Sequence, residues 1–135
     1  MGFFLGLHSL TDWALLVLRI DLAATFFIHG ILKWKMWNMQ PNQQLSPTML
    51  NIFRILSVAE PLGAVALLFG FLTQLAALGI ATIMVGASIM KSRKMHKKFH
   101  ETGGWELDTA LLAGALILLA IGAGAISLDR LVFGL

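Results

Sequence analysis

Residues 61–90 read PLGAVALLFGFLTQLAALGIATIMVGASIM and contain no charged side chain. An α-helix of about 20 apolar residues crosses the hydrocarbon core of a bilayer, which is about 30 Å thick. Together with the mostly apolar residues before it, this stretch predicts two spans, at about 50–72 and 74–90. Only Thr73 separates them, so we expect a tight antiparallel hairpin. Ser46 and Pro47 fit the N-cap and the first position of its first helix.

The rest of the chain has the same apolar character. Of its 135 residues, 58% are hydrophobic and 13% are charged, and its mean hydropathy is +0.82. Soluble domains carry about twice that share of charged residues, so an ordinary soluble domain is excluded. Further spans are predicted at about 13–32, with Thr11 and Asp12 as candidate caps, and at about 106–126. We therefore predict one all-α domain over residues 1–135, an integral membrane four-helix bundle with antiparallel up-down topology in the lipid bilayer.

The basic residues predict how this bundle is oriented, because Lys and Arg next to short loops remain on the cytoplasmic side of a membrane. One side of the predicted bundle carries only Arg130. The basic residues of the first and third loops, on the other side, are Lys33, Lys35, Lys91, Arg93, Lys94, Lys97 and Lys98. We expect both termini on the exterior and a multi-pass protein of the cell's inner (cytoplasmic) membrane. The basic run at 91–98 is interpreted as this topology signal and not as a nucleic-acid site.

Ionisable side chains inside the predicted spans are the candidate functional residues. A charge at membrane depth is costly and is retained for pairing, proton movement or ligand binding. The candidates within or just inside the spans are Arg19, Asp21, His29, Arg54, Glu60 and Asp108.

These candidates fall into two layers at a rise of 1.5 Å per residue. Asp21 and Glu60, with Arg19 nearby, lie close to the midplane, and the others lie near the cytoplasmic boundary. Arg19, His29 and Lys33 also share a face of the first helix, which Asp21 extends. We expect this broad polar face to turn into the bundle. The expected interior ion pairs are Arg19 with Asp21 or Glu60, and Arg54 with Asp108 or Glu106.

Two interpretations of Glu60 remain open. It is either an ion-pair partner that fixes helix register, or a partly unpaired carboxylate that handles a proton or the polar end of an apolar ligand. His29, Arg19 and Asp21 are the candidates to act with it. Pro61 favours the second interpretation, because proline cannot donate to the Ser57 carbonyl and leaves a free acceptor beside Glu60. The alternative for Pro61 is a simple packing kink.

The residues predict no metal site. No cysteine is present, which excludes disulfides, thiolate metal sites and iron–sulfur clusters. His96 and His100 have a spacing compatible with a metal, but lysines surround them and no fixed carboxylates complete a ligand set. Only His29 lies in a span, so a haem held by two histidines is not expected.

Three stretches occur in a distinctive order. Residues 18–33, LRIDLAATFFIHGILK, contain an Arg and end in His-Gly followed by Lys. Residues 59–79, AEPLGAVALLFGFLTQLAALG, combine a Glu with a glycine-containing hairpin. Residues 103–129, GGWELDTALLAGALILLAIGAGAISLD, open with Gly-aromatic-Glu and end in a Gly-rich, Ser-Leu-Asp sequence. Together they resemble the DoxX family of small four-span bacterial and archaeal membrane proteins, with Gln74 in place of the family's usual hairpin Arg.

The resemblance implies a role but no reaction. DoxX-like and DoxD-like chains resemble subunits of quinone-linked oxidation systems, so it implies an accessory subunit of a quinone-linked membrane redox complex. Such a chain binds other membrane subunits and has no redox cofactor of its own. Alternatives are a binder or transporter of a lipid or quinone-like molecule near Glu60, and a purely structural assembly subunit. The family-like positions, none with an assigned catalytic role, are Arg19, His29, Gly30, Glu60, Gly63 and Glu106.

Overall fold

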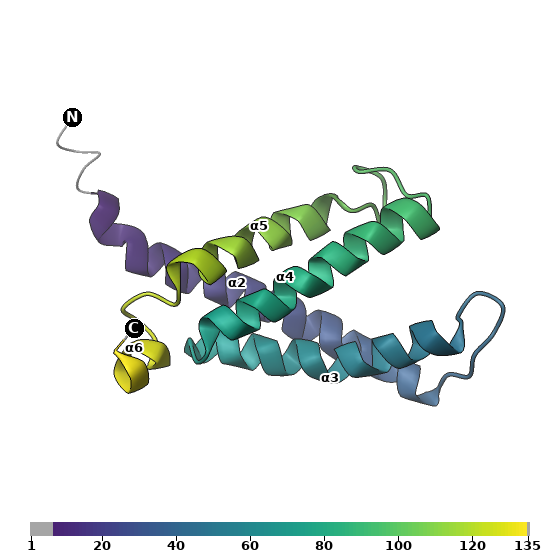
Figure 1. Cartoon of the computed structure of the whole chain (residues 1–135), viewed down its shortest axis with the longest axis horizontal. Coiled ribbons are helices and arrows are strands. Elements are labelled where there is room, and N and C mark those ends of the chain that lie inside the picture. The colour runs from purple at the N-terminus through teal and green to yellow at the C-terminus, as the bar shows by residue number, and fades with distance from the viewer. Residues whose placement is uncertain (1–6, 135) are drawn as a thin grey trace.

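The four longest helices of the computed structural model alternate in direction (Figure 1). The structure describes residues 7–134, and within them no β-strand occurs, which confirms the predicted all-helical class. The α-helices are α2 (Thr11–Leu32), α3 (Pro47–Phe69), α4 (Thr73–Ile89), α5 (Glu106–Ile121) and α6 (Leu128–Phe133). Two 3₁₀ helices, Leu7–Leu10 and Lys33–Asn38, precede and follow α2, and a π-helical turn, Met90–Lys94, extends α4.

These helices pack as two antiparallel hairpins (Figure 1). α2 packs along α3, and α4 packs along α5. One end of the bundle holds the two long loops, residues 39–46 and 95–105, and the other holds the α3–α4 turn, the start of α2 and α6 (Figure 1). The basic residues next to these loops, in Lys33–Asn38, in Met90–Lys94 and at 97–98, therefore share one end of the molecule.

Three helical segments are long and apolar enough to cross a membrane: Leu7–Asn38, Pro47–Phe69 and Thr73–Lys94. Their outer faces expose large apolar side chains; for example, Val17 is 64% exposed and Leu62 is 66% exposed. A soluble monomer rarely exposes so much continuous apolar surface, whereas the hydrocarbon of a bilayer requires it. The chain is therefore a membrane protein, as predicted.

The predicted N-cap of α3 is confirmed, and the predicted caps of α2 are wrong. Ser46 caps α3, because its hydroxyl accepts a backbone N–H of the first turn at 3.2 Å. Thr11 and Asp12 do not cap α2, whose N-cap residue is Leu10. The Asp12 carboxylate instead accepts the backbone N–H of Ala125 at 2.7 Å, from the far end of the chain.

α5 is shorter than predicted and ends at Ile121 instead of near residue 126. Gly122 and Gly124 have φ angles of +88° and +80°, in the left-handed region that glycine adopts without steric cost. A helix of this length is about 24 Å long, less than the hydrocarbon thickness of a bilayer. The chain continues beyond it as non-helical backbone over residues 122–127.

Side chains from earlier helices bind the backbone around segment 122–127. Arg19 donates to the carbonyl of Ala123 at 2.8 Å, and Asp12 accepts from Ala125. Gln74 donates to a carbonyl in the last turn of α5 at 2.9 Å. Unpaired backbone groups are costly at membrane depth, so these bonds permit α5 to end early.

Small residues bring the helices into close contact. Ala64, Ala77 and Ala115 are almost fully buried in one core with Phe26 and Leu67. Small side chains at such contacts allow helix backbones to approach each other.

α2 approaches α3 closely at Gly30. A Cβ atom placed on Gly30 would collide with the Pro61 ring, so glycine is the residue that fits there. This contact fixes the end of α2 beside Glu60.

Candidate functional site around Glu60

Glu60 is buried in α3, with 2% of its surface exposed. Its Oε2 atom forms an ion pair and a hydrogen bond with Nζ of Lys33, which follows α2. The Lys33 side chain is 22% exposed and leads from the buried carboxylate toward the end of the bundle. The site is thus a lysine–carboxylate ion pair in which the carboxylate is buried and the lysine is partly exposed.

The expected pairing of Glu60 with Arg19 is therefore wrong. Of the two interpretations of Glu60, the geometry fits the ion-pair partner and not the partly unpaired carboxylate. Arg19 lies about 21 Å before Lys33 along the helix axis. Lys33 reaches Glu60 because its flexible four-carbon stem extends back from the helix end. The signal was available, because Lys33 lies on the same face of the first helix as Arg19 at 100° per residue.

Pro61 leaves the Ser57 carbonyl without its helical N–H donor, as the sequence predicts. Trp34 occupies this place, because its indole Nε1 donates to the Ser57 carbonyl at 2.9 Å. The free carbonyl acceptor beside Glu60 is therefore occupied by a side chain of the same protein.

Trp37 completes this contact. Its indole Nε1 donates to Oγ of Ser57 at 2.9 Å, and the Ser57 hydroxyl donates to the Arg54 carbonyl at 2.6 Å. Neither Trp34 nor Trp37 was among the residues predicted from the sequence. The available signal was two tryptophans three residues apart at a membrane border, which a 3₁₀ helix places on one face.

Arg54 does not form the expected pair with Asp108 or Glu106. Its Nε donates to the carbonyl of Met36 at 3.1 Å, and one terminal nitrogen donates to the carbonyl of Met39 at 3.0 Å. A guanidinium satisfies the free carbonyls at a helix C-terminus. Arg54 thus binds the end of the Lys33–Asn38 helix that carries both tryptophans.

Asp108 is buried in α5 and pairs with Lys91 at the end of α4, with 2.8 Å between Nζ and Oδ1. Each hairpin therefore has a lysine after its first helix that reaches a carboxylate in its second. Glu106 is exposed and forms no ion pair among the described residues.

Arg19 is buried at the opposite end of the bundle. Besides its bond to Ala123, it interacts electrostatically with Asp129. The Asp129 carboxylate accepts the backbone N–H groups of Leu72 at 2.6 Å and Thr73 at 2.9 Å, so it binds the start of α4. Arg19 therefore belongs to the contacts of the α3–α4 turn and segment 122–127, away from Glu60.

His29 and Asp21 do not join Glu60 either. His29 is half-buried and Asp21 is exposed, and neither forms a hydrogen bond or ion pair with another residue that the structure describes. The expectation that Asp21 turns into the bundle is wrong. At 100° per residue it lies about 160° from Arg19, which marks the buried face.

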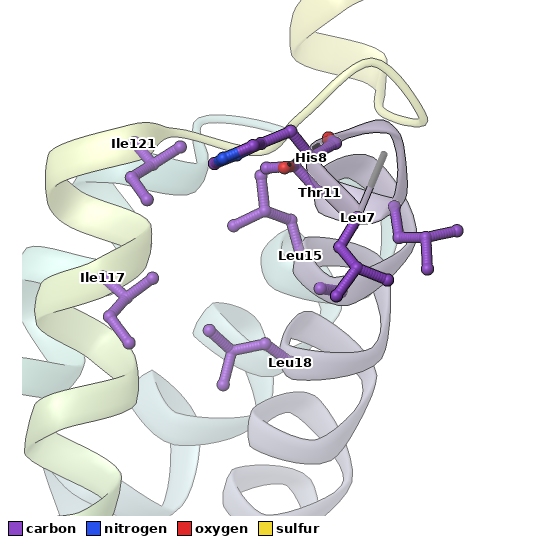
Figure 2. A pocket seen from close by; sticks show the side chains of 9 residues that line it. Leu7, His8, Thr11, Leu15, Leu18, Ile117 and Ile121 are labelled. Atoms are coloured by element: carbon purple, nitrogen blue, oxygen red, sulfur yellow. Dashed lines mark hydrogen bonds between the residues drawn. The ribbon is translucent and has the colours of Figure 1, made fainter. Parts of the chain in front are cut away.

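A groove of about 420 Å³ lies between α2 and α5 at the Arg19 end (Figure 2). Leu15 and Leu18 of α2 face Ile117 and Ile121 of α5 across it, and the imidazole of His8 extends over its end (Figure 2). Its volume lies within the range of small-molecule sites. The lining is apolar except at this end.

The histidines of the basic loop do not share a helical face. The helix has ended before His96, whose φ is +51°. Within residues 7–134, no three His, Asp or Glu side chains are grouped so that they could hold a metal ion.

These features define an α-helical multi-pass membrane protein with lysine–carboxylate pairs between its helices. The family model named DoxX matches residues 14–93, and the chain belongs to the DoxX family. The match covers Arg19, His29, Gly30 and Glu60 and confirms the resemblance. Comparisons with curated proteins and with solved structures gave no match.

Proposed function

We propose that the chain crosses the inner membrane four times, with both termini outside. α5 and segment 122–127 together form the fourth crossing. Support comes from the alternating helix directions and from the basic residues beside the two long loops, which lie at one end of the bundle (Figure 1). That end faces the cytoplasm, where Lys and Arg are retained.

Cysteine labelling tests this topology, because the sequence contains no cysteine. Ser92→Cys places one in the basic loop and should resist an impermeant maleimide in intact cells. Ala125→Cys, at the opposite end, should react. Labelling of Ser92→Cys in intact cells would reverse the proposed orientation.

We further propose that the chain is an accessory subunit of a quinone-linked membrane redox complex and has no redox cofactor of its own. The carrying observation is that the charged side chains buried in the bundle already have partners within the chain. The interior is thus occupied, and the outer apolar surface is available for contacts. The resemblance of DoxX-like and DoxD-like chains to subunits of quinone-linked oxidation systems supports the redox context.

Purification from native membranes in a mild detergent tests this role. A tagged chain should retain dehydrogenase or oxidase subunits in stoichiometric amounts, and an unrelated small membrane protein with the same tag should not. A clean, monodisperse homo-oligomer would contradict the proposal.

The groove between α2 and α5 favours a second candidate function, the binding of a lipid or quinone-like molecule. Glu60 is the less suitable place for such a ligand, because Lys33 and Trp34 already contact that region. In the groove, an apolar chain would lie against Leu18 and Ile117 and its polar end would reach His8.

Native mass spectrometry of the purified chain tests this second function. The chain should carry one retained lipid or quinone, and Ile117→Trp should remove it by filling the groove. Leu116→Trp is the matched control, because Leu116 is exposed on α5 outside the groove. Equal retention by both variants would contradict a site in the groove.

A further inference from the structure

Asp21 has an unusual position for a carboxylate. It lies in the middle of α2, about 12 Å along the helix from Trp13, and is exposed on the outside of the bundle. It makes no hydrogen bond or ion pair with any other described residue. In a bilayer its charge would face hydrocarbon.

The buried face of α2 shows that this outward direction is fixed. Leu15, Arg19, Leu22 and Phe26 pack into the bundle and hold the rotation of the helix about its axis. Asp21 lies opposite this face at 100° per residue. The carboxylate therefore cannot reach the interior without removing Arg19 from its contacts.

An outer stripe of α2 surrounds Asp21 with alternating steps of three and four residues. Its members, all exposed, are Ala14, Val17, Asp21, Ala24, Ile28 and Ile31. This is the spacing of a helix that packs against another helix. The small side chain of Ala24 next to Asp21 allows close approach of a second backbone.

A charge in a transmembrane segment normally faces a protein interior or a water-filled cavity and has a partner there. Asp21 satisfies this rule only if another protein covers the stripe. We infer that the outer stripe of α2 docks a transmembrane helix of a partner subunit that carries an Arg or Lys at mid-membrane depth.

Charge decides between this occupant and a second copy of the chain. A twofold axis through the stripe would bring two Asp21 carboxylates together, and two neighbouring carboxylates resist simultaneous ionisation. A basic side chain neutralises the carboxylate directly. The inference rests on the proposed subunit role and assigns it a surface.

A designed peptide tests the chemistry of the stripe. The probe is a fluorescent transmembrane helix of Leu and Ala with one central Arg, compared with the same peptide carrying Leu there. Energy transfer to the labelled full chain in mild-detergent micelles should show binding of the Arg peptide only. Asp21→Asn should weaken this binding about three- to tenfold, and Ala24→Trp should abolish it.

Matched variants control for general effects. Glu106→Gln removes an exposed carboxylate elsewhere, and Leu62→Trp adds bulk to an exposed position on α3. Both should bind the Arg peptide like the original chain. Equal binding of the Arg and Leu peptides, or unchanged binding by Asp21→Asn, would overturn the inference. So would a disulfide-linked homodimer formed efficiently by Val17→Cys.

A native gel of solubilised membranes separates this inference from the proposed function. The original chain should migrate in a large complex, and Asp21→Leu should migrate alone with unchanged thermal stability. A complex that survives Asp21→Leu would overturn the stripe as the docking surface and leave the subunit role intact. An original chain that migrates alone would overturn the subunit role itself.

Discussion

The two ends of the bundle bury charge in different ways. At the end with the long loops, Glu60 pairs with Lys33 and Asp108 pairs with Lys91, side chain to side chain. At the other end, Arg19 and Asp129 bind backbone groups of a turn and of segment 122–127. A pair of side chains joins two helical segments and can be replaced as a pair. A backbone group cannot be replaced, so the charge that binds it has no substitute.

The largest effect is expected from Arg19→Met. This change leaves the Ala123 carbonyl without a donor and Asp129 without its nearby cation. The free energy of unfolding should fall by about 4 kcal/mol, as measured by SDS titration in mild-detergent micelles. Arg19→Lys retains the charge and should recover part of the loss. A fall below about 1 kcal/mol for Arg19→Met would remove the contrast between the two ends.

Lys33→Met should cost about 3 kcal/mol in the same measurement, because it leaves the Glu60 carboxylate buried without its cation. The double variant Lys33→Met with Glu60→Gln should recover most of this loss, since a buried pair can be replaced together. If the double variant is as unstable as the single one, the stability that Lys33 supplies does not come from its pairing with Glu60 alone.

Gly30→Ala should cost about 2 kcal/mol, because the new Cβ collides with the Pro61 ring and forces α2 away from α3. Gly63→Ala is the matched control, since a Cβ there meets nothing within 4 Å. Thermal unfolding of the two variants measures the difference. Equal melting temperatures would show that α2 and α3 adjust at this close contact without a loss of stability.

The smallest effect, about 1 kcal/mol, is expected from Trp34→Phe. The ring is largely preserved, but the Ser57 carbonyl loses its hydrogen-bond donor. Trp13→Phe, at the opposite end of α2, changes an exposed tryptophan and should leave the unfolding free energy unchanged. A Trp34→Phe protein as stable as this control would indicate that water replaces the indole.

The first three spans and the free Ser57 carbonyl beside Pro61 could be predicted because they depend on local properties. An apolar run has the length of a membrane helix wherever it packs, and Pro61 removes the same hydrogen bond in any helix. Ser46 caps α3 through its own first turn. These features need no information about neighbouring elements.

The partners of the buried charges could not be predicted, because they depend on which arc of each helix faces the interior. Arg19, His29 and Asp21 cover too wide an arc to be buried together, and packing against α3 turned Asp21 outward. The partner of Arg19 exists only because α5 unwinds at Gly122, which a helical continuation to residue 126 does not contain. Lys33 was assigned to the loop as a topology signal, although its long stem reaches back to Glu60.

The contacts of segment 122–127 have a consequence for the order in which the protein is made. Arg19 and its acceptor are 104 residues apart, and Asp12 and its donor are 113 residues apart. A ribosome delivers α2 to the membrane long before it has synthesised the residues that bind its Arg19 and Asp12 side chains. Until then the guanidinium of the nascent first helix has no partner in the chain, and the helix lies either near the headgroups or inside the insertion machinery. Residues translated more than 100 positions later lock the first helix in place.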